Sequence, residues 1–427
     1  MEERLRNVNI KIRLPKPPKT IKQNTIMYSV LFILLFFLSA IGDVEVPGPL
    51  QFLAKHYDEA LTLLLVMYVF FHIKYIERKK NRLFIGQICL LTIGMLSTIF
   101  FHYQGMLISI VDAVLLVSRF LIAYYSAYIF LKIHKKNVSQ YILNITKIIT
   151  IFLFVFSLHE IFFDPFLPTS DYRYFMYGLQ LFFPHATYMA AAAATLLIYF
   201  GYMHNKGKKV FIYMIMSTLL VCFTLRMKAV GFSVIYWLFY VQTFYFKKRH
   251  YYFTALICIV VVLFVAYDAL MTNFLTEGRF MPRMIMLQDG ISLMISHFPL
   301  GTGFASYGSA MAASNYSPLY TKLGYVANRG MSPTDTSFLT DVFWPTVFAQ
   351  FGLIGTGVFI FILITLIKIA IRVLKKDKAR GFSMVMIMSY YLITSTAESG
   401  FFNPTALLMF LMFGALETER DLSSRFK

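Results

Sequence analysis

The sequence has 427 residues, of which 58% are hydrophobic and only 14% are charged, and its mean hydropathy is +0.64. A soluble domain carries nearer a quarter of charged residues, so these values exclude an ordinary soluble enzyme and indicate a polytopic membrane protein. The formal net charge is +19, and its meaning depends on where the cations lie along the chain.

Long apolar segments predict an all-α transmembrane helical bundle. Runs such as Met27–Ile41 and Phe359–Ile367 lack the alternating polarity of barrel strands, which favours helices. About twelve spans are predicted, at residues 27–41, 60–73, 84–101, 107–131, 141–163, 185–203, 209–225, 229–246, 251–271, 343–367, 382–397 and 402–416.

The predicted spans divide the chain into five regions. In order they are a cytoplasmic basic tail, spans 1–9, one large extracytoplasmic loop, spans 10–12 and a second cytoplasmic tail, at residues 1–26, 27–271, 272–342, 343–416 and 417–427. Three prolines make the first tail extended rather than helical. Because the first span continues into a bundle, we interpret it as a retained signal anchor.

The Lys and Arg residues are distributed unevenly between the two sides of this topology. Both tails and the loops on the same side hold 30 of the 40, and those loops are residues 73–83, 132–140, 203–209, 247–250 and 368–381. The opposite side holds eight. The positive-inside rule therefore places both termini in the cytoplasm and the large loop outside. Most of the net charge faces the anionic membrane surface, so nucleic-acid binding is not expected.

Two cations that violate this rule lie in the run Thr224-Leu225-Arg226-Met227-Lys228, at the outer end of a span. One interpretation is that Arg226 and Lys228 extend toward lipid phosphates. The other is that they face a cavity and bind an anionic ligand, as ionisable groups at membrane depth commonly do.

Arg279 and Arg283 lie four residues apart in the large loop. If Pro282 begins a helix that continues through Met284–Ser296, both side chains can point the same way. Two planar guanidiniums suit a pyrophosphate, because each can form paired hydrogen bonds to phosphate oxygens. The alternative is a pair of ordinary surface arginines on an interfacial helix.

Other candidate contacts lie at the predicted outer mouths of the spans. Arg173 precedes Phe183-Pro184-His185, where His185 is either a capping residue or a ligand contact. The loop also carries His297 and Arg329. In Phe298–Gly303, the glycines Gly301 and Gly303 indicate a sharp turn or a close backbone approach.

Carboxylates supply the candidate general bases. Asp335 and Asp341 flank an apolar stretch that leads into the tenth span, and Asp335 is equally suited to be a helix N-cap just before Thr336. Glu398 lies at an outer helix mouth. Asp112 and Arg119, seven residues apart on one predicted span, are expected to share a face and help the helices of the bundle pair.

No motif of a soluble enzyme is present. There is no P-loop, no Gly-x-Ser-x-Gly, no His-Glu-x-x-His and no Asp-x-Asp pair for a metal–nucleotide complex. Cys89, Cys222 and Cys258 lie within apolar segments and show no disulfide or metal spacing. We therefore expect no cofactor and no metal.

The overall plan resembles the O-antigen polymerase (Wzy) and O-antigen ligase superfamily of bacterial surface-polysaccharide enzymes. The likeness rests on about twelve spans, cytoplasmic ends and one large outer loop late in the chain. Four segments carry it further: Arg283 with Met284–His297 and Pro299–Phe304; Asp335–Leu339 leading to Phe351–Gly355; Thr224–Lys228; and Arg173 with Phe183–His185. The chain departs from ligase-like members in having Asp335 where they have His and Gln350 where they have Glu.

The resemblance implies a metal-independent, inverting, GT-C-like glycosyltransferase at the outer face of the bacterial inner membrane. It implies a substrate linked to undecaprenyl pyrophosphate, and a chain-length regulator is a possible partner. The expected pyrophosphate and substrate contacts are Arg226, Lys228, Arg279, Arg283, Arg173, Arg329, His297, Gly301, Gly303 and Glu398. Asp335, Asp341 and His185 are the candidate bases, and the departures leave the choice among them open.

Three functions agree with this pattern. The first is a polysaccharide polymerase that joins lipid-linked repeat units. The second is a ligase of the same superfamily that moves finished glycan to another acceptor. The third is a transporter or flippase, which is disfavoured because the two halves of the chain show no similarity to each other and the single large loop is asymmetric.

Overall fold

The computed structural model describes residues 19–41, 51, 56–77, 81–114, 118–134, 138–163, 166–173, 176–246, 282–396 and 398–419. The predicted span 251–271, Arg279 and most of the basic tail lie outside the described residues. The described part is mostly helical, as the sequence predicts, and adds one short β-hairpin that it does not predict.

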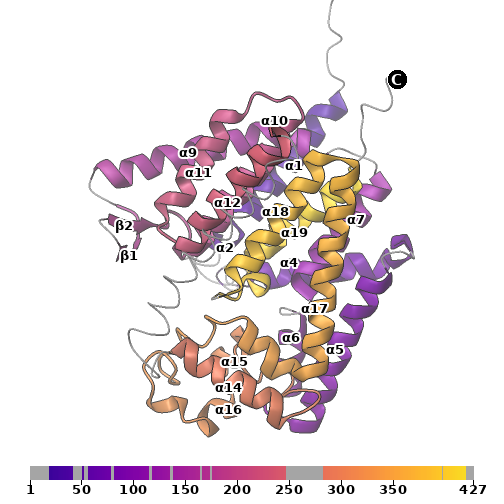
Figure 1. The fold of residues 1–427 in the computed structure, drawn as a ribbon, viewed down its shortest axis with the longest axis vertical. Coiled ribbons are helices and arrows are strands. Elements are labelled where there is room, and N and C mark those ends of the chain that lie inside the picture. Colours follow the sequence, from indigo (N-terminus) through magenta and orange to yellow (C-terminus); the bar gives the residue numbers. More distant parts are fainter. Residues whose placement is uncertain are drawn as a thin grey trace, which may run out of the picture.

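The described α-helices run in chain order through the fold (Figure 1). They are α1 (Lys19–Phe36), α2 (Leu38–Ile41), α4 (Tyr57–Phe71), α5 (Asn81–Phe101), α6 (Met106–Ala113), α7 (Arg119–His134), α8 (Val138–Tyr141), α9 (Leu143–Phe162), α10 (Ala186–Asn205), α11 (Phe211–Phe223), α12 (Met227–Phe244), α14 (Pro282–Ser296), α15 (Ala310–Ser314), α16 (Pro318–Lys322), α17 (Trp344–Lys376), α18 (Lys378–Thr394) and α19 (Thr405–Thr418). Strands β1 (Thr169–Arg173) and β2 (Met176–Leu179) pair antiparallel.

Four described helices are long and apolar enough to cross a bilayer, by length and composition: Arg82–Phe101, Leu143–Phe162, Ala186–Asn205 and Trp344–Lys376. At about 1.5 Å per residue, 20 residues cover about 30 Å, which matches the hydrocarbon core of a membrane. These helices indicate a membrane protein, and the count of twelve spans stays a prediction.

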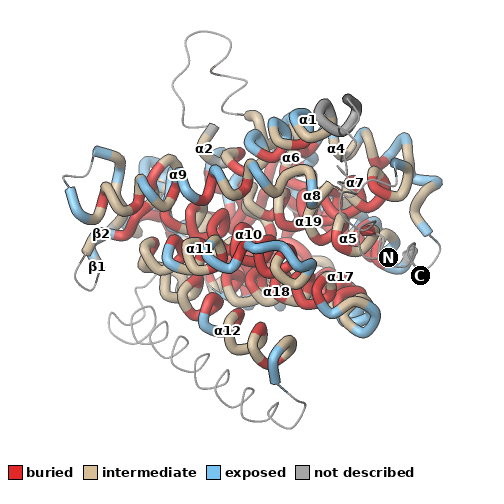
Figure 2. Tube along the Cα trace, turned by 90° about the horizontal axis from the view of Figure 1, so that it is seen from above, coloured by how far each residue is buried: buried red, intermediate tan, exposed pale blue. Residues whose placement is uncertain are grey.

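Helix α10 lies at the centre of the bundle. Within its most apolar 18 residues 89% are buried, against 33–39% in the other three long apolar helices. Figure 2 shows the buried residues concentrated around α10, α18 and α19. The run Ala190–Ala194 is entirely buried, because alanine side chains let neighbouring helices approach closely.

Helix α17 is broken at Gly352, where φ is +61°. The break leaves carbonyls of α17 without partners in the helix, and the turn at residues 299–303 donates hydrogen bonds to them. Thr302 N donates to Ala349 O at 2.8 Å, and Gly303 N donates to Gln350 O at 3.0 Å. In return, Ile354 N donates to Pro299 O at 3.3 Å. Backbone groups that the kink would leave unpaired are thereby satisfied.

The close approach at this break requires glycine on both sides. A Cβ on Gly301, whose φ is +84°, would lie 2.3 Å from Gly352 N. A Cβ on Gly352 would lie 2.4 Å from Gly301 N. Two of the segments that carry the family resemblance, Pro299–Phe304 and Phe351–Gly355, are therefore in direct backbone contact.

Residues 282–342 form a compact unit, which we call the loop unit. Figure 1 shows α14, α15 and α16 grouped beside one end of α17, near α5 and α6. Its own core includes Met286, Leu293, Tyr307, Tyr320, Tyr325 and Leu339. The Tyr307 and Tyr325 hydroxyls are 2.7 Å apart, and Tyr325 donates to Asp289 at 2.7 Å.

Asp112 connects the loop unit to the bundle. Within the predicted span 107–131, α6 covers Met106–Ala113 and α7 begins at Arg119, and residues 115–117 between them lie outside the described residues. Asp112 Oδ2 accepts from Ala305 N at 2.5 Å and from Ser309 Oγ at 2.9 Å. Arg119 Nη2 instead pairs with Asp58 at 2.8 Å.

We expect Gly352→Ala to destabilise the protein, because alanine in the left-handed region costs about 1–2 kcal/mol and its Cβ would press on the Gly301 amide. Thermal unfolding of the purified protein in detergent measures the effect. Gly357→Ala is the matched control on the same helix, because nothing lies within 4 Å of its added Cβ. Equal melting temperatures for the two variants would contradict this account of the kink.

Candidate functional site

Five charged side chains from four parts of the chain interact at one end of the bundle. Arg226 and Lys228 lie at the α11–α12 turn, Arg283 begins α14, Asp341 ends the loop unit and Glu398 lies between α18 and α19. Arg283 Nη2 pairs with Asp341 Oδ2 at 3.0 Å. Lys228 and Glu398 attract each other, and both also feel the charges of Arg226, Arg283 and Asp341. We call these five residues the charged cluster.

The local structure of the turn places two cations where a helix disfavours them. Arg226 is the N-cap of α12, with φ −89° and ψ 100°, and Lys228 lies in the first turn. The N-terminus of a helix carries a partial positive charge, so cations there are destabilising unless anions compensate. Glu398 and Asp341 supply two carboxylates, which leaves the cluster one positive charge in excess.

Burial shifts the pKa values of two members of the charged cluster, Lys228 and Glu398. It lowers the pKa of Lys228, which precedes the predicted span 229–246, to about 8, although Glu398 opposes the shift. Burial raises the pKa of Glu398, although Lys228 and Arg226 oppose that shift. Because a raised pKa makes a carboxylate a better proton acceptor near neutral pH, Glu398 is suited to acid–base chemistry as well as to binding.

Arg226 also holds the predicted candidate His185. Its Nη2 lies 2.6 Å from Ser170 Oγ and 3.0 Å from His185 Nε2. A guanidinium only donates, so Nε2 of a neutral imidazole accepts from Arg226. Nδ1 lies 2.8 Å from Thr187 Oγ1 and accepts from Thr187 N at 3.4 Å, so His185 is the N-cap of α10. The lone pair of His185 is therefore occupied, and His185 can accept a proton at Nε2 only after Arg226 moves.

The β-hairpin lies directly against the turn that carries Arg226. Ser170 is in β1, and a Cβ on Gly178 in β2 would lie 2.9 Å from Thr224 O. Glycine at position 178 is what allows this contact. The hairpin thus contacts the Arg226 guanidinium through Ser170.

The Glu398 segment and the end of the loop unit are linked. The Ser399 hydroxyl lies 2.7 Å from Thr340 O and 2.9 Å from Val342 O, the carbonyls on either side of Asp341. This contact brings the connection between α18 and α19 next to the segment that bears Asp341. The carboxylates of Asp341 and Glu398, more than fifty residues apart in sequence, can therefore act on the same cations.

The remaining predicted residues have other surroundings. Asp335 is exposed, and its bonds with Ser337, which include acceptance from Ser337 N at 3.2 Å, hold its pKa below the usual range. No described helix begins at residue 336, so Asp335 closes a turn and is not the helix N-cap that the sequence allowed. Arg329 is exposed and acts on Asp335. His297 Nε2 lies 2.8 Å from Tyr103 OH, and burial lowers the His297 pKa.

Three further predictions concern backbone positions or lie outside the description. Gly301 and Gly303 belong to the turn that joins the loop unit to α17 and α5, since a Cβ on Gly303 would lie 2.5 Å from Thr98 N. Arg173 ends β1, and its backbone alone is described. Arg279 lies outside the described residues. Within the described residues, no group of three His, Cys, Asp or Glu side chains could hold a metal ion.

Sequence reasoning missed the side chains that orient the charged cluster: Ser170, Thr187 and Ser399. Ser399 lies beside Glu398 in a polar run at a helix mouth, so its neighbourhood was recognisable, but its partners were not. Nothing in the local pattern of residues 169–179 predicts a hairpin that reaches Arg226.

We expect Glu398→Gln to destabilise the protein by about 1–3 kcal/mol, because Lys228 loses its main compensating charge while it stays partly buried. The double variant Lys228→Met/Glu398→Gln should lose less than the sum of the two single variants. Denaturant unfolding of all four proteins gives the coupling free energy.

The exposed pair Lys132–Glu77, whose nitrogen and oxygen are 3.1 Å apart, is the control, and Glu77→Gln should have a smaller effect. A coupling free energy near zero between Lys228 and Glu398 would contradict the electrostatic account of the cluster.

Comparison of the chain with family models and with curated protein sequences finds no match.

Proposed function

We propose that this chain is a Wzy-type polysaccharide polymerase. In this proposal a GT-C-like bundle of about twelve spans joins repeat units that are linked to undecaprenyl pyrophosphate, at the outer face of the bacterial cytoplasmic membrane. The observation that carries it is the charged cluster, in which Arg226, Lys228 and Arg283 come together from separate parts of the chain with Asp341 and Glu398.

The cluster has the chemistry that a lipid pyrophosphate needs. The leaving group bears several negative charges, and two guanidiniums with one ammonium can bind its oxygens. These cations also stabilise the charge that develops as the bond between the anomeric carbon and the pyrophosphate oxygen breaks. Neither a nucleotide nor a metal is needed for that stabilisation.

The carboxylates of the cluster can accept the proton that the acceptor hydroxyl loses during the transfer. The acceptor hydroxyl oxygen attacks the anomeric carbon, the pyrophosphate leaves with the bonding electron pair, and the hydroxyl proton passes to a base. Asp341 and Glu398 are the carboxylates beside the cations, and the burial of Glu398 raises its proton affinity. We assign the role of base to one of these two in preference to Asp335, whose pKa is lowered by its own turn.

In this scheme, the cations of the cluster exchange their partners within the protein for the pyrophosphate when the substrate binds. Without ligand, Arg283 is neutralised by Asp341 at 3.0 Å, and Arg226 is held by Ser170 and His185. A pyrophosphate that takes over these cations releases Asp341 and the Nε2 lone pair of His185. Binding of the donor therefore frees Asp341, which is one of the two carboxylates to which we assign the role of base.

The ligase and transporter alternatives make different predictions. Loss of a polymerase in cells leaves single repeat units on the acceptor, whereas loss of a ligase leaves long polymer on its lipid carrier. Polymer formation by purified protein in detergent, where no gradient exists, would dismiss a transporter.

Arg283→Ala is expected to reduce polymerisation about 100-fold, the typical loss when one donor to a developing oxyanion is removed. Polymer length on gels, from cells or from purified protein, measures the effect. Arg283→Lys should retain part of the activity, because it keeps the charge and loses the bidentate geometry. Lys322→Ala, at an exposed loop cation over the Tyr103 ring, is the control. Normal long chains from Arg283→Ala at normal protein level would remove Arg283 from the mechanism.

Pyrophosphate affinity should depend on the protonation of Lys228. Its pKa of about 8 means that the ammonium loses its charge as pH rises from 7 to 9, whereas an arginine keeps its charge throughout. Calorimetric titration with metal-free pyrophosphate at pH 7, 8 and 9 compares wild type with Lys228→Arg. The ratio of wild-type to variant affinity should fall about tenfold across this range. A constant ratio would show that Lys228 does not contact the anion.

A further inference from the structure

A cavity of about 500 Å³ lies among α1, α4, α7, α8, α10 and α19, away from the charged cluster. Its walls are almost wholly apolar and include Phe32, Leu61, Leu65, Phe130, Leu196 and Leu411. Its volume falls within the range of about 300–1,000 Å³ that ligand sites occupy. Nothing in the proposed function uses it.

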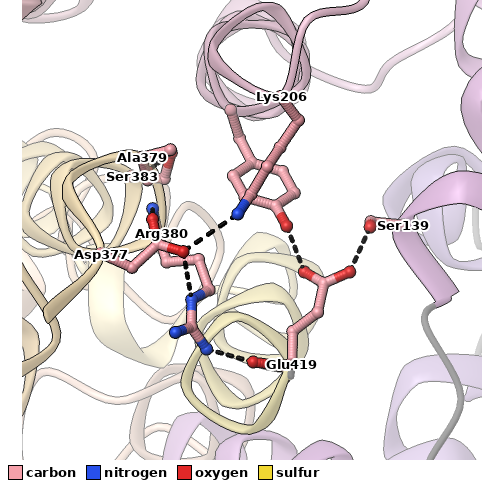
Figure 3. A network of polar contacts seen from close by, with 8 residues as sticks. Ser139, Lys206, Asp377, Ala379, Arg380, Ser383 and Glu419 are labelled. Carbon is pink, nitrogen blue, oxygen red and sulfur yellow. Dashed lines mark hydrogen bonds and ion pairs between the residues drawn. The ribbon is translucent and has the colours of Figure 1, made fainter. Parts of the chain in front are cut away.

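The polar groups at one end of the cavity bind one another. Glu419 accepts from Ser139 Oγ and from Tyr202 OH, each at 2.5 Å, and Tyr199 OH donates to Ser139 O at 2.6 Å. Figure 3 shows Glu419 and Ser139 beside the ion pairs that Asp377 makes with Lys206 at 3.0 Å and with Arg380 at 2.9 Å. With these groups satisfied, the cavity itself offers hydrocarbon contacts rather than a site for a charged ligand.

The network lies at the end of the bundle opposite to the charged cluster. Helix α10 begins beside His185, and α19 begins after Glu398, so both helices run from the cluster to the Tyr202 and Glu419 end. The Lys-rich loops lie on that side, which the positive-inside rule assigns to the cytoplasm. The polar end of the cavity, at Tyr202 and Glu419, thus lies on the side that is predicted to face the cytoplasmic leaflet.

The passage from the cavity toward the charged cluster is closed. A second space shares Leu35, Thr195 and Leu408 with the cavity and reaches Phe183, but its volume is about 10 Å³, roughly that of a single water probe. Phe183 stacks on Phe37 with ring centroids 5.7 Å apart, which helps to close this route. An occupant therefore does not enter from the substrate end.

The side of the cavity next to α1 gives access from the bilayer. Leu31 lines the cavity and is 46% exposed, and Leu34 on the same helix is 41% exposed. An apolar void of this size, left empty, would forfeit the dispersion contacts of its walls. Water does not fill such a void, because it finds few polar partners there. In a membrane, the available apolar filler is lipid hydrocarbon.

We propose that this cavity is a binding site for one acyl chain of a membrane glycerophospholipid from the cytoplasmic leaflet. Tyr68 favours an ester lipid over a polyprenyl chain: it lines the cavity near the end of α4, and its buried hydroxyl has no hydrogen-bond partner among the described residues. In this proposal, the Tyr68 side chain turns its hydroxyl toward the cavity and donates to an ester carbonyl of the lipid. The bound chain fastens α1 to α7 and α19. This inference goes beyond the proposed function and does not depend on it.

The test is lipid retention by the full-length protein purified in mild detergent, measured by native mass spectrometry and by analysis of extracted lipid. Ala415 lines the cavity from α19, so Ala415→Phe fills the space. Ile364→Phe is the control, because Ile364 is on the outer surface of α17 and 43% exposed. We expect wild type and the control to retain one phospholipid per chain, and Ala415→Phe to retain at least fivefold less.

Three results would overturn the proposal: no retained lipid in wild type, equal retention in Ala415→Phe, or retention of a polyprenyl lipid in place of a phospholipid. If Ala415→Phe does not fold, Leu65→Trp fills the same cavity from α4 and takes its place. Added phospholipid should raise the melting temperature of wild type and leave that of the filled variant unchanged. Because none of these measurements involves polymer, their outcome is separate from that of the proposed function.

Discussion

The exchange of backbone hydrogen bonds at Gly352 is the contact on which the rest of the arrangement depends. The break in α17 presents the carbonyls of Ala349 and Gln350 to Thr302 and Gly303. A polar loop can rest against a membrane helix only if such groups are paired, because unpaired peptide groups are costly in apolar surroundings. With this contact in place, the start of α14 and the segment before α17 bring Arg283 and Asp341 to the α11–α12 turn.

The charged cluster shows why cations and carboxylates occur together here. Three cations near one helix N-terminus would repel one another and the helix dipole, and burial increases that cost. Two carboxylates offset part of this repulsion, and an anion can compete with them for the three cations. The stability of the unliganded protein and the capacity to bind an anion therefore rest on the same side chains.

The sequence predicts the parts of this fold that depend on composition and on local pattern. The apolar runs predict α5, α9 and α10, and the misplaced cations lead to Arg226, Lys228 and Arg283. It does not predict that Asp112 binds the loop unit, because the partners Ala305 and Ser309 lie far away in the sequence. The sequence also cannot show which of Asp341 and Asp335 belongs to the charged cluster, because both precede the same span. The two differ in their partners in the structure, which are Arg283 for Asp341 and Ser337 for Asp335.

The hairpin adds a geometric constraint on the guanidinium that it supports. Gly178 lies against Thr224 O so closely that one extra methyl group would push the two segments apart. Ser170, on the paired strand, reaches Arg226 only at that spacing. Gly178 has no charge, no reactive group and no ligand contact. Its small size nevertheless sets the distance between the hairpin and the turn, and so the orientation of the Arg226 guanidinium nearly fifty positions later in the sequence. The size of the residue at position 178 is therefore as tightly limited as the identity of the arginine.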